Sequence, residues 1–169
     1  ILSGYDTLRI ILAKRTILVE GPSDELIIQK AYLQKHRKLP IQNGVDVINV
    51  RGLSFLRFLD IGKELGLDIG VVTDNDGNYD ERVTKKYEGY ISDKIKIFAS
   101  SDNSKKTLEP QLIGSIGVDT LNTIFSTSHT EKDLVVFMTG NKTECALKIF
   151  EYDGNISFPD YINEAVANE

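Results

Sequence analysis

Short apolar segments alternate with helix-like segments along the chain, and this alternation restricts the fold more than any other feature of the sequence. The first apolar run, residues 15–20, contains β-branched residues and ends at a Gly-Pro pair, after which Ser23 and Asp24 are typical of a helix N-terminus. The second, residues 45–50, is followed by a glycine and then by apolar residues at helical spacing. Strands that alternate with helices usually pair in parallel. We therefore expect an α/β fold with a mainly parallel central sheet and helices on both faces.

The same reasoning gives each expected element a range. Strands are predicted at residues 15–20, 45–50, 67–73, 94–98 and 133–138. Helices are predicted at residues 8–13, 23–38, 55–65, 109–113, 119–125, 142–152 and 160–167. Residues 75–90 have no clear period, which predicts a loop and a solvated helix, and the polar residues 100–106 predict a flexible loop.

The length of the chain, 169 residues, is enough for one compact domain with a core, so we expect a single domain over residues 1–169. No apolar stretch reaches the roughly 20 residues that cross a bilayer, and no signal peptide is recognisable at the N-terminus. We therefore expect a cytoplasmic protein with no membrane partner. Because the chain begins at Ile1 inside an apparent helix, we also expect it to be a fragment of a longer protein.

The metal chemistry open to this chain is limited by its few soft ligands. Cys145 is the single cysteine, and His36 and His129 are the two histidines, which excludes an internal disulfide and the familiar zinc sites. Any metal must be held by oxygen. The net charge of −5 argues against passive binding of nucleic acid, unless the acidic residues themselves hold cations.

Acidic residues follow two of the predicted strands. Glu20 ends the first strand, Asp24 lies four positions on in the first turn of a helix, and Asp74 and Asp76 follow the third strand directly. In open parallel sheets, ligands bind beyond the carboxyl ends of the strands. Two aspartates at i and i+2 can turn toward one hard cation, and Gly77 gives the backbone the freedom to make that turn.

Each of these residues also has an ordinary structural explanation. Asp24 can simply complement the helix dipole, and Glu20 before a glycine can belong to a plain turn. The sequence Asp-Asn-Asp-Gly at residues 74–77 consists of common turn residues. Their joint placement at one edge of one sheet is what favours a cation site over these explanations.

Two known ligand-binding motifs are excluded. Asp74, Asp76 and Asn78 occupy the first, third and fifth positions of an EF-hand loop, but its sixth position is Tyr79 and its twelfth is Lys85, where glycine and glutamate are needed. The chain also has no Gly-x-x-x-x-Gly-Lys-Ser/Thr sequence and hence no P-loop.

A strand ending in Glu20-Gly21, followed about fifty residues later by a strand ending in Asp74-x-Asp76, resembles the TOPRIM domain of topoisomerases, primases and several nucleases. The resemblance is greatest to the OLD (overcoming lysogenization defect) nucleases, and residues 6–25 are its most specific part. It extends from about Asp6 to the helix after Lys142. The resemblance implies a Rossmann-like TOPRIM fold.

Two further site residues are implied only by this resemblance. Family members place a third acidic ligand in a short Leu-Glu motif after the paired aspartates, and Glu109 in residues 107–112 fits it. They also place a lysine at the start of a late helix, and Lys142 fits. By themselves, Glu109 is better explained as a helix-opening acid before a proline, and Lys142 as an exposed lysine in the first turn.

The resemblance implies a metal-dependent endonuclease that hydrolyses DNA phosphodiester bonds with two Mg²⁺ or Mn²⁺ ions. Two ions about 4 Å apart can activate water and stabilise the charge on phosphorus and on the leaving oxygen. Glu20 and Lys142 are the expected catalytic residues. The expected metal ligands are Glu20, Asp24, Asp74, Asp76 and Glu109. Expected partners are nucleic acid, with DNA as the substrate, an N-terminal ABC-type ATPase domain of the parent chain, and a second copy in a homodimer.

Other functions remain open at this point. The main alternative is a non-catalytic TOPRIM module that binds metal or nucleic acid and regulates an attached ATPase. A phosphatase or phosphotransferase with Asp74 as nucleophile is less favoured, because the commonest motif of that class places its aspartate pair after the first strand. A topoisomerase is disfavoured, because strand passage needs a nucleophilic tyrosine on a separate domain.

Overall fold

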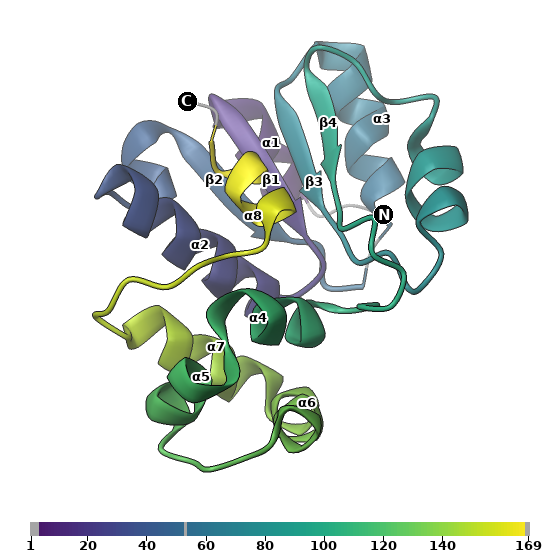
Figure 1. Ribbon diagram of the computed structural model, residues 1–169. Helices are drawn as coiled ribbons and strands as arrows, with labels where there is room; N and C mark the ends of the chain where they lie inside the picture. Colours follow the sequence, from purple (N-terminus) through teal and green to yellow (C-terminus); the bar gives the residue numbers. More distant parts are fainter. Residues whose placement is uncertain (1–3, 53, 168–169) are drawn as a thin grey trace.

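The computed structural model describes residues 4–52 and 54–167. Within these residues, four parallel strands form one sheet in the order β2-β1-β3-β4 (Figure 1). The strands are β1 (Arg15–Val19), β2 (Val45–Asn49), β3 (Ile69–Val72) and β4 (Ile95–Phe98). The predicted α/β fold with a parallel sheet is confirmed.

Helices cover both faces of the sheet, as predicted (Figure 1). Alternate strand residues belong to two separate cores: Ile17 and Val19 pack with the α2 side, whereas Leu18 and Val71 pack with the α3 side. The helices of the first layer are α2 (Pro22–His36) and α8 (Asp160–Ala165). Those of the second are α1 (Gly4–Leu12) and α3 (Phe55–Leu65). The burial of both faces explains why all residues of β1 and β3 are buried.

A group of helices lies beyond the carboxyl ends of the strands (Figure 1). It consists of α4 (Leu108–Ile116), α5 (Val118–Phe125), α6 (Glu131–Gly140) and α7 (Lys142–Glu151). Residues of α4, α5, α6 and α7 share one hydrophobic core with α2 and the sheet. This group therefore packs directly against the edge at which the sequence places the acidic residues.

The strand predicted at residues 133–138 is wrong, because this segment lies within α6. Its run of β-branched and aromatic residues misled the prediction. Thr130 caps the helix by accepting a hydrogen bond from the backbone amide three residues on. Leu134 and Met138, one helical turn apart, enter the core, while Val136 between them is 70% exposed. A helix buries the i and i+4 positions together, whereas a strand would bury alternate residues.

Two of the connections between strands contain short helices that are not α-helices. A 3₁₀-helix, η1 (Pro40–Asn43), precedes β2, and a short π-helix, η2 (Asp80–Lys85), lies within residues 75–90, where we predicted a loop and a solvated helix. Residues 100–106 have no helix or strand, as expected of a loop.

The chain order of the strands reverses direction beside β1. From β1 the chain moves to β2 on one side, and it then returns to β3 on the other side. Such a topological switch point leaves a crevice between the carboxyl ends of the two diverging strands. Here those strands are β1 and β3, which end immediately before Glu20 and Thr73.

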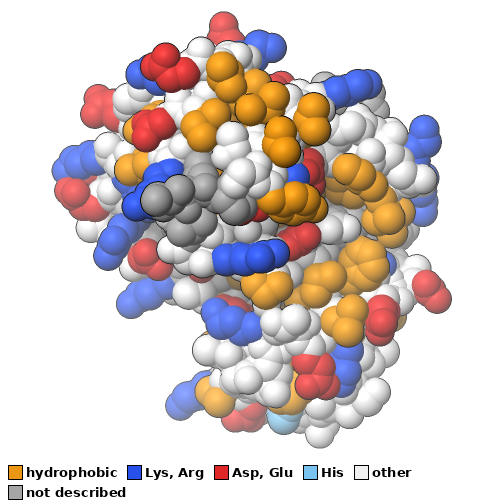
Figure 2. All heavy atoms as spheres, turned by 180° about the vertical axis from the view of Figure 1, so that it is seen from behind, with side chains coloured by type: hydrophobic (Ala, Val, Ile, Leu, Met, Phe, Trp, Pro, Cys, Tyr) orange, Lys and Arg blue, Asp and Glu red, His pale blue; other side chains and the backbone are white. Residues whose placement is uncertain are grey.

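The surface seen from behind carries hydrophobic side chains among charged ones (Figure 2). Tyr5, Leu8 and Leu12 of α1 are each more than half exposed. In the described part of the chain, no helix combines the length and the apolar character needed to span a membrane.

Candidate metal centre

Glu20 connects the ends of the two strands that flank the switch point. Its Oε1 atom accepts a hydrogen bond of 2.7 Å from the Thr73 hydroxyl and one of 3.2 Å from the Asp74 backbone amide. Both bonds cross from β1 to β3, between residues more than fifty positions apart. The Glu20 side chain is therefore held over the crevice, although the residue as a whole is exposed.

Asp24 lies in the first turn of α2, on the same edge. Its Oδ2 atom accepts a hydrogen bond of 3.1 Å from the Gly21 amide, so the residue does help to cap the helix, as its ordinary explanation states. Helix capping alone does not explain the electrostatic environment of the Asp24 carboxyl group. Burial, and then the charge of Glu20, raise the pKa of Asp24 to about 6.

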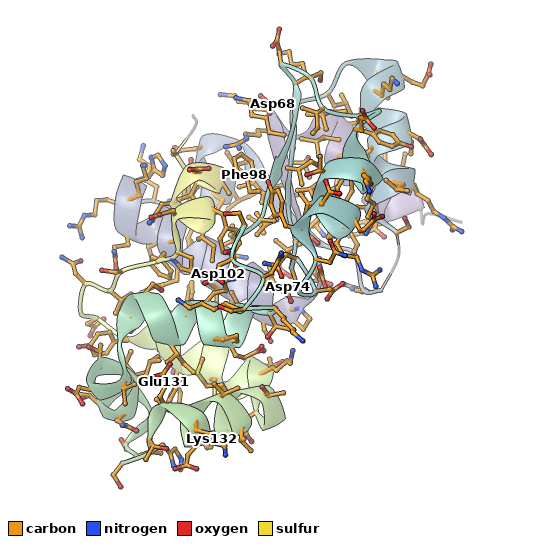
Figure 3. The ribbon with its side chains drawn as sticks, turned by 45° about the vertical axis from the view of Figure 1, so that its right-hand side comes forward. Asp68, Asp74, Phe98, Asp102, Glu131 and Lys132 are labelled. Atoms are coloured by element: carbon orange, nitrogen blue, oxygen red, sulfur yellow. The ribbon has the colours of Figure 1, made fainter. Side chains whose placement is uncertain are left out.

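Asp74 and Asp76 lie in a turn that is shaped by the buried Asn75 between them. The Asn75 amide group donates hydrogen bonds of 2.7 and 2.9 Å to the carbonyls of Ser100 and Asp102, and its Oδ1 atom accepts one of 2.7 Å from the next glycine amide. Asp76 has a left-handed φ of 50°. The turn is thus anchored to the loop at residues 100–106, and Figure 3 shows Asp74 where the sheet meets the helical group.

Glu109, on α4, approaches the crevice from the helical group. It is 4% exposed, accepts a 2.8 Å hydrogen bond from the Thr107 hydroxyl, and forms a 3.0 Å ion pair with Lys142 at the start of α7. Burial acts to raise the pKa of Glu109, but the bonds from Thr107 and Lys142 outweigh it and hold the pKa below its usual value. For Lys142, burial acts to lower the pKa, and the nearby acids, Glu109 first, raise it overall.

The predicted acidic residues are close enough to one another to interact electrostatically. Burial raises the pKa of Asp74 to about 8, with further contributions from the four other acids, Glu20, Asp24, Glu109 and Asp76. Negative charge is therefore in excess at this edge. A bound cation would offset that excess, which is the main physical argument that these residues fit one.

The donor set also fits in its chemistry, because Mg²⁺ and Mn²⁺ favour oxygen ligands. In this structure, however, the acidic side chains of the site do not point toward one common centre. Within residues 4–52 and 54–167, no three His, Cys, Asp or Glu side chains already converge as a ligand group. Asp24 is bonded to a backbone amide and Glu109 to Lys142, so cation binding requires these side chains to rotate away from their partners.

Three residues of this site escaped the sequence analysis. Thr73 positions Glu20, and Asn75 positions the two aspartates, as described above. Tyr161, on α8, is buried, and its pKa is raised first by burial and then by the charges of Asp74 and Asp24. The long-range bonds of Thr73 and Asn75 join residues 25 or more positions apart, which no local sequence pattern indicates. Nothing in the sequence connects Tyr161 with residues almost ninety positions earlier.

Comparison with known proteins shows which family and which solved structures this chain resembles. Residues 11–76 match the family model described as "Overcoming lysogenization defect protein-like, TOPRIM domain". This confirms the resemblance seen in the sequence. Glu20, Asp24, Asp74 and Asp76 lie within the matched segment, whereas Glu109 and Lys142 lie beyond it. No match was found among curated proteins.

Solved structures with this fold include C-terminal regions of OLD proteins. The C-terminal region of the Burkholderia pseudomallei OLD protein is 17% identical, with a TM-score of 0.72, over 92% of this chain and 96% of that one. The corresponding region from Xanthomonas campestris pv. campestris is 18% identical, with a TM-score of 0.62, over 94% and 95%. These similarities confirm the α/β fold as the one found in OLD C-terminal regions.

Proposed function

We propose that the OLD-like TOPRIM domain formed by this chain is a metal-dependent endonuclease that hydrolyses the phosphodiester bonds of DNA. The observation that carries the proposal is that acidic residues follow both β1 and β3 at the switch point, where Glu20 accepts a hydrogen bond from the Asp74 amide and the pKa of Asp74 is raised to about 8. A strongly perturbed acid in a cluster of acids indicates a functional site rather than a set of surface turns. The OLD-like TOPRIM match to residues 11–76 supports a nuclease-type module.

Glu20, Asp24, Asp74, Asp76 and Glu109 would together hold two Mg²⁺ or Mn²⁺ ions. When bound, the two ions supply Lewis-acid stabilisation of the phosphate charge and an activated water. The exposed Asp76 and the half-buried Asp74 need the smallest rearrangement, since in neither is a carboxylate oxygen fixed by a backbone hydrogen bond in the contacts described above. Glu109 must first leave Lys142.

Glu20 is suited to orient the attacking water. Its Oε1 atom accepts both bonds from β3, so Oε2 is the oxygen that faces a cation or water. Thr73 fixes the carboxylate in place and reduces the freedom it would lose on binding.

Lys142 is suited to stabilise the negative charge that develops on the phosphate oxygens. Its ammonium group is about half exposed and pairs with Glu109 at 3.0 Å. If Glu109 turns toward a cation, this positive charge is freed at the same edge, where it can face the phosphate.

The proposal extends to the parent protein. The chain spans nearly the whole length of the OLD C-terminal regions, and this supports a domain of a longer chain. We place an ABC-type ATPase on its N-terminal side and a homodimer as its working form, in the cytoplasm. ATPase and dimer would then supply the selectivity that this domain lacks, because it has no recognition helix for reading bases.

One observation favours the alternative of a non-catalytic module. The acidic side chains of the site do not converge as a ligand group, and its buried Glu109 is already paired with Lys142. A domain that binds a cation only weakly could sense metal or nucleic acid for an attached ATPase without cutting.

Nicking of supercoiled plasmid separates the two functions. The domain with Mn²⁺ or Mg²⁺ is expected to nick, and both EDTA and the Asp74→Ala or Glu20→Ala substitution are expected to abolish nicking. Asp93→Asn is a matched control, because Asp93 is exposed and precedes β4 at the opposite edge of the sheet. Metal binding without nicking by wild-type protein, also in its full-length parent, would establish the non-catalytic alternative.

A further inference from the structure

The segment that contains η2 separates its charged residues into two groups. Lys85 forms ion pairs with Asp80 at 3.1 Å and with Glu81 at 2.5 Å, so its charge is balanced within the segment itself. Val83 and Tyr87, four positions apart, are both buried, and Tyr87 belongs to the core on the α3 side. These anchors fix which side of the segment faces the sheet edge. A π-helix is rare and is often found at functional sites.

Arg82 and Lys86, also four positions apart, line a pocket together with residues of the candidate metal centre. The pocket has a volume of about 290 Å³, and its acidic wall is formed by Glu20, Asp74 and Asp76. Its other lining residues are Thr73, directly after β3, and residues that follow β2 or begin α3. The two cations and the carboxylates of the metal centre thus share one open space.

Neither cation is committed to a strong partner. The Arg82 guanidinium lies 3.8 Å from the Asp76 carboxylate, and both side chains are about 60% exposed, so this pair contributes little to stability. The Lys86 ammonium lies 5.0 Å from the centre of the Tyr87 ring and forms no ion pair within the described residues. To bind an anion, Arg82 gives up only an exposed ion pair, and Lys86 only its contact with Tyr87.

The charge of the pocket explains why such an anion must arrive with metal. Three carboxyl groups face two cations, so the pocket without metal carries no net positive charge that would attract phosphate. One divalent cation reverses that balance. The phosphate would then lie beside the metal centre, within reach of a guanidinium that can bind two of its oxygens.

We propose that Arg82 and Lys86 bind a backbone phosphate that neighbours the bond to be cut, so that the substrate is a polynucleotide strand rather than an isolated phosphodiester. This inference rests on the proposed function of the same site. It places the strand along the edge of the sheet, with one phosphate at the carboxylates and the next in the pocket on the η2 side. Lys142, which is paired with Glu109, lies outside this pocket and has a separate role.

Binding of a fluorescein-labelled DNA duplex tests the assignment independently of cleavage. In Mg²⁺, the double variant Arg82→Gln/Lys86→Gln is expected to bind roughly tenfold more weakly than wild type in fluorescence anisotropy, and its salt dependence, as the slope of log K against log salt, is expected to fall by about 1 to 2. In EDTA the wild-type protein is expected to bind as weakly as the variant.

A matched variant controls for the loss of two positive charges. Lys35→Gln/Lys38→Gln removes two exposed lysines near the C-terminal end of α2, at the opposite edge of the sheet. It is expected to bind DNA as wild type does. Equal weakening in both double variants would show a non-specific effect of net charge and overturn the assignment, as would a wild-type protein that does not bind the duplex in Mg²⁺.

Calorimetric titration with Mn²⁺ distinguishes a phosphate contact from damage to the metal centre. The Arg82→Gln/Lys86→Gln variant is expected to bind Mn²⁺ at least as tightly as wild type, because a positive charge near Asp76 is removed. Loss of Mn²⁺ binding would overturn the inference. If wild type binds DNA through these residues but neither it nor its full-length parent cuts plasmid, the nuclease proposal fails and the assignment of Arg82 and Lys86 to a backbone phosphate stands. If wild type nicks plasmid while Arg82→Gln/Lys86→Gln binds DNA as tightly as Lys35→Gln/Lys38→Gln does, the nuclease proposal stands and this inference fails.

Discussion

The sheet and the helical group both contribute carboxylates to the candidate site, but they balance those charges in different ways. On the sheet side, the pKa of Asp24 is raised to about 6 and that of Asp74 to about 8 by burial and by neighbouring acids. On the helical side, Glu109 is also buried, yet its pKa is lowered because Thr107 and Lys142 bind it. On the sheet side, neither Asp24 nor Asp74 forms an ion pair among its described contacts, whereas Glu109 on the helical side is already paired with Lys142.

This difference indicates which side depends on a cation. A buried carboxylate is tolerated when a hydrogen-bonded partner offsets its charge. Glu109 has such a partner within the chain, and Asp74 has none among its described contacts. We infer that the sheet-side acids form the principal cation site, and that Glu109 joins it only when Lys142 is displaced toward substrate.

The largest effect is expected in a comparison of two neutral substitutions. Asp74→Asn is expected to reduce plasmid nicking by at least about 100-fold, because it removes a principal ligand, while Glu109→Gln is expected to reduce it by about tenfold. Initial rates at saturating Mn²⁺ provide the measurement. Equal losses in the two variants would remove the distinction between the two sides of the site.

Metal addition should stabilise the fold through the same acids. At a Mg²⁺ or Mn²⁺ concentration 100 times the Kd, binding contributes about 2.7 kcal/mol, which corresponds to a rise in Tm of roughly 5 to 10 °C for a domain of this size. Differential scanning fluorimetry with and without EDTA measures the shift. Asp74→Asn is expected to lose most of it, whereas the control Asp93→Asn keeps it. A full shift in Asp74→Asn would place the cation elsewhere.

The turn between the two aspartates should depend on Asn75. Asn75→Ala leaves the carbonyls of Ser100 and Asp102 without their donor, so we expect the free energy of unfolding to fall by about 1–3 kcal/mol. Urea denaturation measures this change. Asn155→Ala, at an exposed position, is the control and is expected to change stability by less than about 0.5 kcal/mol. An unaffected Asn75→Ala variant would show that the turn does not need this anchor.

The smallest effect is a pH dependence with opposite signs on the two sides. Asp74 binds its proton more tightly in the folded state, so its contribution to stability is present below its unfolded pKa near 4 and is lost as the pH rises toward 8. Glu109 has the reverse behaviour: its contribution is present above its unfolded pKa and is lost as the pH falls through the lowered folded pKa.

Urea denaturation of the metal-free protein at pH 5 and pH 8 tests this sign. In EDTA, Asp74→Asn is expected to be more stable than wild type at pH 8, by an amount of the order of 1 kcal/mol, and closer to it at pH 5. Glu109→Gln is expected to be less stable than wild type at both values. Destabilisation of Asp74→Asn at pH 8 would show that the carboxylate has a favourable partner in the fold.

The sheet side could be predicted from the sequence because its signals are local. Residues 15–20 and 67–73 are apolar strands that end at acids, and parallel pairing brings such ends together without any knowledge of side chains. The order of the strands and the role of Thr73 depend on long-range pairing. The hydrophobic periodicity of a single sequence reports only local structure and does not predict such pairing. For the same reason Asn75 gave no sign that it bonds to the loop at residues 100–106.

The helical side was predicted less well because tertiary packing overrides its local preferences. The run within residues 133–138 favours a strand, but Leu134 and Met138 gain more by entering the helical core together. Glu109 and Lys142 were assigned only through a family resemblance, and their ion pair depends on how α4 and α7 pack. Tyr161, on α8, has its pKa raised partly by the acids of the site, and no local pattern predicts where α8 lies relative to them.

The central claim is that carboxylates from the ends of β1 and β3 share a divalent cation. A crystal of the domain soaked in Mn²⁺ near pH 8, examined by anomalous scattering, tests it most directly. We expect Mn²⁺ to be coordinated by Asp74 together with Glu20, with Asp24 or Asp76 turned toward the ion. Manganese bound only elsewhere, or these side chains remaining in their separate hydrogen bonds in a crystal saturated with Mn²⁺, would contradict it.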